Sequence, residues 1–269
     1  MLQLYVRKEG GEGIQGMALS LAEVAIGAAP WFVGFQALQL LSWLLSPILF
    51  ETFSALSTSD KCYWAASITS SLHALFLCPL IAYTWVQTPE LLQAKDVYVS
   101  SDMSFLVNHV FIGYLSSDMI GCFYWRRVWP GSAAILIHHC VGVLVWVVLN
   151  VYGFMHLGAM VAAFMEATTP FVNFRWFFDK AGMKGTTLFM VNGLTMTLLW
   201  FVVRIIAMGY LGVIVYRLSS DINQIGTTAM LTVYGGYTVG YSLQWFWGIK
   251  IFRGALKVIS SQGTHTKST

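Results

Sequence analysis

The chain has 269 residues, of which 57% are hydrophobic and only 10% are charged, and its mean hydropathy is +0.67. A water-soluble domain carries about 25% charged residues, so this composition excludes an ordinary soluble protein. The formal net charge of +3 is too small to indicate a nucleic-acid partner. The composition predicts an all-α polytopic membrane protein.

The first 29 residues are expected to form a polar leader and, over residues 18–29 around Glu23, an interfacial helix. The leader lacks a short apolar core followed by a small-residue cleavage site, so a removed signal peptide is not expected.

Seven hydrophobic stretches follow, each close to the ~20 apolar residues that a helix needs to cross a bilayer. They cover residues 30–50, 63–86, 105–125, 133–152, 155–178, 186–211 and 226–247. We therefore expect one transmembrane bundle over residues 30–257 and a disordered cytoplasmic tail over residues 258–269.

The lysines and arginines are shared unevenly between the two sides that seven spans define. Nine lie on the side of the C-terminus: Lys61, Arg126, Arg127, Lys180, Lys184, Lys250, Arg253, Lys257 and Lys267. Four lie on the other side: Arg7, Lys8, Lys95 and Arg217. Because positive loops favour the cytoplasm, we expect a cytoplasmic C-terminus and a lumenal N-terminus.

Ionisable residues inside spans are costly in lipid and therefore indicate functional sites. The predicted spans contain Asp118, His138, His139, Glu166, Arg175 and Arg204, with His73, His109, Asn173 and Asn192 as polar neighbours.

The third and fourth spans are joined by a short loop around Trp129. Asp118 precedes this residue by eleven positions and His138 follows it by nine. At a rise of ~1.5 Å per residue, both side chains lie roughly 14–17 Å from the turn, so Asp118 should meet His138 or His139. Such a pair either holds a histidine ready for proton transfer or fixes helix packing.

Glu166 and Asn173 are seven residues apart and so share one helix face. Pro170 lies between them and predicts a kink that frees backbone carbonyl groups. Arg175 is expected to reach lipid head groups at the membrane surface. For Arg204, two partners stay open: Glu166, or lumenal head groups.

No metal site is expected. Adjacent residues on a helix point about 100° apart, so His138 and His139 do not readily chelate one ion. A site would require His109 and Asp118 to converge with one of them. The four cysteines show no paired spacing, which indicates small buried hydrophobic residues rather than a disulfide or zinc framework.

Four motifs occur in order along the chain. They are Ser-Ser-Leu-His-Ala at residues 70–74, Gly-Tyr-Leu-Ser-Ser-Asp at 113–118, Leu-Ile-His-His at 136–139 and Glu-Ala-Thr-Thr-Pro-Phe-Val-Asn-Phe-Arg-Trp-Phe-Phe at 166–178. Together they resemble the TLC-domain family, which includes the TRAM proteins and the ceramide synthases. The resemblance covers roughly residues 60–257. It is closest to the small, uncharacterised TLC-domain proteins.

The resemblance implies six helices around a lipid-accessible cavity, with the first span peripheral. Ceramide synthases use a histidine pair, matched here by His138 and His139, in acyl transfer from acyl-CoA. Their acidic motif after the histidines has two further acids, where this chain has only Glu166. The candidate catalytic residues are His138, His139, Asp118 and Glu166. The candidate lipid or head-group ligands are Arg175, Asn173, Arg204, Asn192 and His109.

Three functions follow as hypotheses. The first is a lipid-homeostasis protein of the endoplasmic reticulum that binds, senses or remodels a lipid within its bundle. The second is an acyltransferase with acyl-CoA as co-substrate. The third is a structural lipid-binding subunit of a larger complex. Membrane lipids are the expected partners, with a membrane-protein partner or a second copy as further options, and no bound cofactor is expected.

Overall fold

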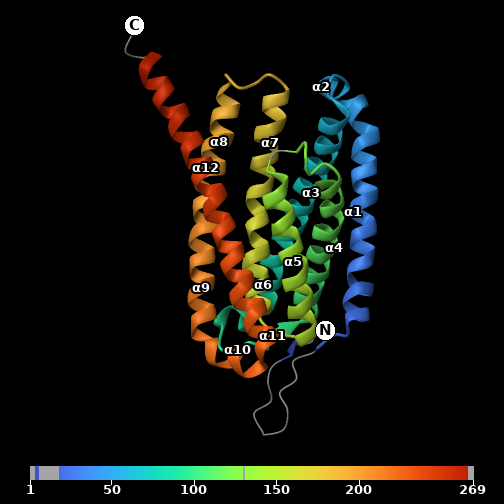
Figure 1. Cartoon of the computed structure of the whole chain (residues 1–269), viewed down its shortest axis with the longest axis vertical. Coiled ribbons are helices and arrows are strands. Elements are labelled where there is room, and N and C mark those ends of the chain that lie inside the picture. Colours follow the sequence, from blue (N-terminus) through green and yellow to red (C-terminus); the bar gives the residue numbers. More distant parts are fainter. Residues whose placement is uncertain (1–3, 6–17, 130, 266–269) are drawn as a thin grey trace.

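The computed structural model describes residues 4–5, 18–129 and 131–265, whose helices run roughly along one long axis (Figure 1). The elements are β1 (Leu4–Tyr5), α1 (Leu21–Leu49), α2 (Glu51–Ser54), α3 (Thr58–Gln87), η1 (Pro89–Gln93), β2 (Ser100–Ser101), α4 (Asp102–Tyr124), α5 (Ser132–Tyr152), α6 (His156–Ala163), η2 (Phe164–Thr168), α7 (Thr169–Lys180), α8 (Thr187–Leu199), η3 (Trp200–Ile206), α9 (Ala207–Arg217), α10 (Ser219–Ile225), α11 (Thr227–Met230), η4 (Leu231–Gly235) and α12 (Gly236–His265). Apart from the two-residue strands β1 and β2, which pair antiparallel, the described fold is helical, as predicted.

Helix α1 begins at a capping box. The Glu23 N–H donates to Ser20 Oγ over 3.2 Å, and the Glu23 carboxylate accepts from the Ser20 N–H over 2.8 Å. The helix then continues through Pro30 to Leu49. The expected separate interfacial helix at residues 18–29 is therefore wrong. One proline removes a single backbone donor, which is not enough to end a helix in apolar surroundings.

The second, third and fourth predicted spans correspond to single helices, α3, α4 and α5. The last three correspond to composite helices that change geometry along their length: α6–η2–α7, α8–η3–α9 and α11–η4–α12. η2 is a 3₁₀ segment, whereas η3 and η4 are π-helical. Helix α12 extends to His265, into the segment expected to be a disordered tail, and residues 266–269 lie outside the described part.

Four helices of the described chain are long and apolar enough to cross a membrane: residues 21–49, 58–87, 132–152 and 187–217. Large apolar side chains cover their outer faces, for example Ile48, Val86 and Leu198, which are 78%, 75% and 65% exposed. Helix α4 and the helices α6–η2–α7 and α11–η4–α12 run along the same bundle (Figure 1). They also contain buried polar residues, such as Asn108 and Asn173.

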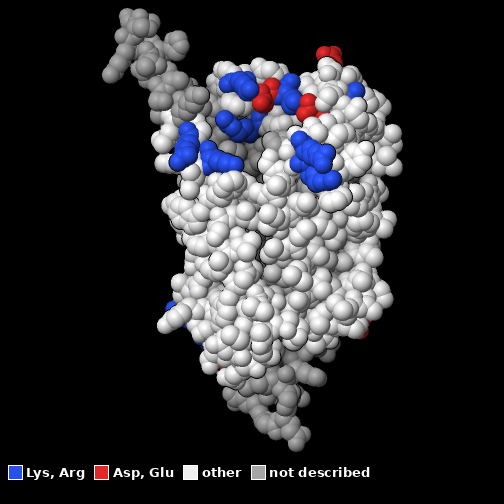
Figure 2. All heavy atoms as spheres, viewed as in Figure 1, with Lys and Arg blue, Asp and Glu red and all other residues white. Residues whose placement is uncertain are grey.

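Helices α1, α4, α7 and α12 end at the upper end of the bundle in Figure 1. That end therefore carries the described cations near the helix ends and loops there: Lys61, Arg126, Arg127, Lys180, Lys184, Lys250 and Arg253. Figure 2 shows lysine and arginine side chains gathered at this end around a hollow in the surface, above a largely uncharged body.

Candidate functional site

Two cavities that share lining residues lie inside the bundle, and we name them the wide lobe and the narrow lobe. The wide lobe has a volume of about 520 Å³ and is lined by α3, α4, α5, α7, α8 and α12. The narrow lobe, of about 100 Å³, lies deeper, between α4, α5, α6, α9 and α12. His138, Glu166 and Arg204 line both lobes, so the lobes adjoin at these side chains, a place that we call the junction. No residue of α1 lines either lobe, which places this helix outside the cavity wall.

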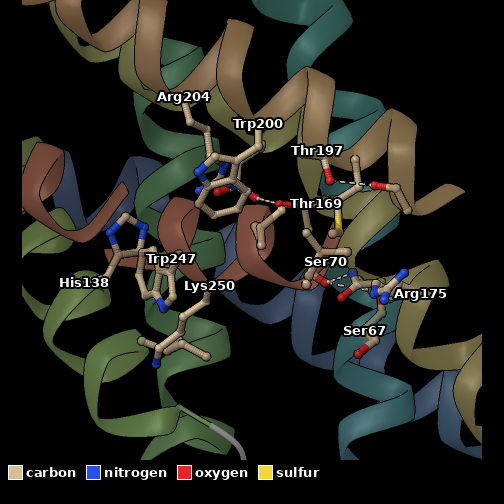
Figure 3. A pocket seen from close by; sticks show the side chains of 18 of the residues that line it. Ser67, Ser70, His138, Thr169, Arg175, Thr197, Trp200, Arg204, Trp247 and Lys250 are labelled. Atoms are coloured by element: carbon tan, nitrogen blue, oxygen red, sulfur yellow. Dashed lines mark hydrogen bonds between the residues drawn. The ribbon is translucent and has the colours of Figure 1, made fainter. Parts of the chain in front are cut away.

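The two lobes differ in chemistry. Beyond the junction, apolar side chains dominate the narrow lobe, among them Leu115, Val145, Leu149 and Met208. The wide lobe is also largely apolar, but it includes more polar groups and the cations Arg175 and Lys250. In Figure 3, Arg175 lies across the pocket from His138 and Trp247, and Lys250 lies beside Trp247. A charged group therefore finds partners in the wide lobe, and a hydrocarbon chain finds them in the narrow one.

Arg204 projects into the bundle from the π-helical segment η3 and is only 6% exposed. Its Nε–H donates to Thr168 Oγ1 over 2.7 Å, its Nη1 donates to Gln244 Oε1 over 3.0 Å, and its guanidinium lies 4.4 Å from the Trp200 ring centroid. A guanidinium has five N–H donors, so three have no protein acceptor within the described residues. Arg204 thus presents a charged donor at the junction.

The hydrogen-bond partners of Arg204 differ from both predicted partners. Within the described residues it forms no ion pair with Glu166 and it points inward rather than to head groups at the lumenal surface. Gln244, a polar residue within a predicted span, was an available signal that the sequence analysis missed.

Glu166 lies in the 3₁₀ segment η2 and accepts a hydrogen bond from Thr169 Oγ1 over 2.6 Å. Pro170 follows in the first turn of α7. Before this proline, α-helical geometry stops at Ala163 and resumes at Thr169, and the predicted kink with freed carbonyl groups stays a prediction. The change in geometry places the Glu166 carboxylate at the junction of the lobes.

The predicted contact between α4 and α5 is also confirmed, and His139 rather than His138 makes it. His139 Nε2 lies 3.2 Å from Asp118 Oδ2, while its Nδ1 lies 2.8 Å from the Ile135 carbonyl oxygen. Cys122 Sγ lies 3.5 Å from the same carboxylate oxygen. Cys122 is four residues after Asp118 and therefore shares its helix face, a spacing that the sequence analysis did not use.

His138 contacts this pair only through its ring. The ring packs edge-to-face on both His139 and Trp247, with 5.6 Å between centroids in each case. Neither of its ring nitrogens has a hydrogen-bond partner in the part of the chain that the structure describes. The imidazole is therefore available to a molecule in either lobe.

Asn173 and Asn192 act mainly between helices. The Asn173 amide nitrogen lies 2.7–2.9 Å from Ser67 O, Ser70 Oγ and Ser71 Oγ of α3. The Asn192 amide donates to Phe171 O over 2.9 Å and does not line the cavity.

Two other candidate ligands differ in position. Arg175 lines the wide lobe, 4.3 Å from the Phe189 ring centroid. The His109 ring packs against Gly27 of α1, outside the cavity. Nine residues separate His109 from Asp118, which is two and a half helical turns, so these two side chains occupy opposite faces of α4.

The sequence profile of the TLC domain matches residues 63–253. TLC domain-containing protein 4 of Homo sapiens is 28% identical over 236 residues, which cover 85% of this chain and 88% of the relative. TLC domain-containing protein 4-B of Xenopus laevis is 32% identical over 228 residues, covering 81% of this chain and 83% of the relative.

The matched range contains every residue that lines the junction, together with the Asp118–His139 pair. With its apolar helices, this chain belongs to the TLC domain family and is an integral membrane protein.

Proposed function

We propose that this protein binds an amphipathic membrane lipid inside its helix bundle and acts in lipid homeostasis by binding, sensing or remodelling that lipid. The observation that carries the proposal is the pair of adjoining lobes. One lobe opens among cations, the other is apolar, and Arg204 lies where they meet. The head group would occupy the wide lobe, and part of a hydrocarbon chain would occupy the narrow one.

The head group, rather than the hydrocarbon chain, is expected to determine which lipid binds. A lipid that leaves a bilayer for the narrow lobe exchanges one apolar environment for another, so chain burial alone gives little net free energy. A buried guanidinium with free donors favours an anionic head group, because charge-assisted hydrogen bonds to phosphate or carboxylate strengthen away from water. Arg175 and Lys250 add positive charge on the way to the junction.

The direct test of the proposal is to purify the full chain in mild detergent and identify its lipids by mass spectrometry. We expect an anionic, chain-bearing lipid at a constant ratio to protein after extensive washing. A lipid profile that only mirrors the host membrane, and washes away, would remove the proposal. A fixed-lipid subunit of a larger complex would instead retain its lipid while cellular lipids stayed unchanged on deletion of the protein.

We further propose seven spans, with the C-terminus in the cytoplasm and the N-terminus in the lumen of the endoplasmic reticulum. The cations around the hollow support this orientation, because positive charge favours the cytoplasmic side (Figure 2). The cavity then opens toward the cytoplasm.

Tags at the two termini should therefore report opposite sides of the membrane. In sealed microsomes, protease should remove a C-terminal tag and spare an N-terminal one until detergent is added. Equal sensitivity of both tags before detergent would exclude an odd number of spans.

Acyl transfer from acyl-CoA is a second candidate function, favoured by the unpaired imidazole of His138 at the junction. There it could act as general base or nucleophile on a chain held in the narrow lobe. The Asp118–His139 pair and Glu166 supply further acid–base groups in the wide lobe.

The histidine variants separate catalysis from packing. If His138 is catalytic, His138→Ala should lower the amount of one acylated lipid product by a factor of about 10² or more. Folding should change little, since an intramembrane hydrogen bond is worth only ~0.6 kcal/mol on average and His138 makes none within the described residues. Lipid profiling of cells and thermal unfolding of the purified protein measure both effects. If the cellular lipids stay unchanged when both His138 and His139 are replaced, the acyltransferase function is excluded.

A further inference from the structure

Three side chains of different metal-ligand types meet in the wall of the wide lobe. Asp118 Oδ2, Cys122 Sγ and His139 Nε2 all lie within 4.8 Å of one another. Asp118 and Cys122 occupy one face of α4, one turn apart, and His139 faces them from α5. Cys122 and His139 are 3% and 6% exposed, so protein shields both from bulk water.

The hydrogen-bond chemistry requires a cation between two of these groups. The Ile135 carbonyl oxygen only accepts hydrogen bonds, so His139 Nδ1 carries a proton and donates it there. In a neutral imidazole, Nε2 is then a lone-pair acceptor, and it lies 3.2 Å from the Asp118 Oδ2 oxygen. Either a proton or a metal ion must lie between Nε2 and Oδ2.

Two of the three distances match the edges of a tetrahedral zinc site. Zinc lies about 2.0 Å from imidazole nitrogen and carboxylate oxygen and about 2.3 Å from thiolate sulfur, so the tetrahedral angle places N and O about 3.3 Å apart and O and S about 3.5 Å apart. The observed separations are 3.2 Å for His139 Nε2 to Asp118 Oδ2 and 3.5 Å for Cys122 Sγ to Asp118 Oδ2. The third edge, between His139 Nε2 and Cys122 Sγ, is within 4.8 Å, so a rotation of the thiol toward the imidazole completes the set.

We propose that Asp118, Cys122 and His139 bind Zn²⁺, with a fourth coordination position open to the wide lobe. A thiolate, an imidazole and a carboxylate form a mixed ligand set that zinc accepts. The bond from His139 Nδ1 to the Ile135 carbonyl is the outer-shell contact that fixes the tautomer of most zinc-bound histidines. Because all three ligands line the lobe, water or a lipid oxygen completes the coordination there.

The bound ion would change what the cavity can do. Binding releases the Cys122 thiol proton and any proton shared by Asp118 and His139, since the ligands must be deprotonated. A zinc ion with an open position polarises a carbonyl or phosphoryl oxygen and acidifies a bound water. The site does not require that the cavity take a lipid, so it stands or fails separately from the proposed lipid binding.

The test uses the full chain purified in detergent, stripped with a chelator and titrated with Zn²⁺ or Co²⁺. We expect equimolar zinc by elemental mass spectrometry and, with Co²⁺, the near-ultraviolet charge-transfer absorption of a thiolate ligand. Cys122→Ser should abolish this absorption. It should also weaken zinc binding by more than the factor of about 10–100 that loss of an outer-shell partner costs.

The matched control is Cys140→Ser, which removes an exposed thiol of the same helix that carries His139. It should leave both the absorption and the zinc content unchanged. Zinc binding that is equal in wild type and Cys122→Ser would overturn the proposal and leave a shared proton between Asp118 and His139. If Cys122→Ser fails to fold, the wild-type Co²⁺ spectrum decides alone, because absence of the thiolate band overturns the site.

Discussion

Replacement of Arg204 by methionine is expected to strip the purified protein of its bound lipid. Methionine has no charge, so the substitution removes the buried charge from the junction. It keeps much of the volume of the aliphatic part of the arginine side chain. Truncation of one partner of a buried, hydrogen-bonded charge pair costs about 2–5 kcal/mol, which is roughly a 30- to 4,000-fold loss of affinity. The lipid-to-protein ratio, measured by mass spectrometry after equal washing, reports the change.

The control for this variant is Arg217→Met, which removes an exposed cation from the end of α9. It should retain lipid as the wild type does. Arg204→Lys should be intermediate, because lysine keeps the charge but not the planar fork that holds Thr168, Gln244 and a head group together. Full lipid occupancy in a folded Arg204→Met protein would contradict the role of Arg204 at the junction.

Replacement of Ala162 by phenylalanine is expected to shorten or exclude the bound hydrocarbon chain. Ala162 lines the narrow lobe, whose volume is only about 100 Å³, so an added ring takes up space that a chain would use. The wide lobe does not include this residue and should stay unchanged. Mass spectrometry of the retained lipid should show shorter chains, or less lipid, with the same head-group class.

Leu144→Phe provides the matched control, since it adds a ring to the outer face of α5, where Leu144 is 63% exposed. Its lipid chain profile should equal that of the wild type. An Ala162→Phe protein with unchanged chain lengths and unchanged lipid content would show that the chain does not enter the narrow lobe. Overpacking costs about 1–3 kcal/mol, so thermal unfolding of both variants must accompany the comparison.

The sequence predicted the positions of most helices, because long apolar stretches and helix length depend on local composition. It did not predict that α1 would continue through Pro30. A proline removes one backbone hydrogen bond, and the helix continues where its other interactions outweigh that loss. The π-helical segments η3 and η4 were also missed. Each turn of π-helix shifts the register of side chains after it, and no residue pattern along the chain specifies that shift.

The same limits explain which site residues were found. The contact between Asp118 and His139 followed from equal depth in an antiparallel pair of helices, a quantity that can be counted along the chain. Arg204 was identified as unusual, but its partners depend on the π-helical register and on α12, which lies far away in sequence. His109 illustrates a different limit, because this candidate lipid or head-group ligand faces α1 and lines neither lobe, a direction that span position alone does not give.

The most direct measurement is a density map from electron cryomicroscopy of the protein in lipid nanodiscs, bound to an antibody fragment. The proposal predicts continuous density that begins in the wide lobe near Arg175, passes Arg204 and enters the narrow lobe between α5 and α12. A cavity that holds only water, with ordered lipid confined to the outer faces of the helices, would contradict it.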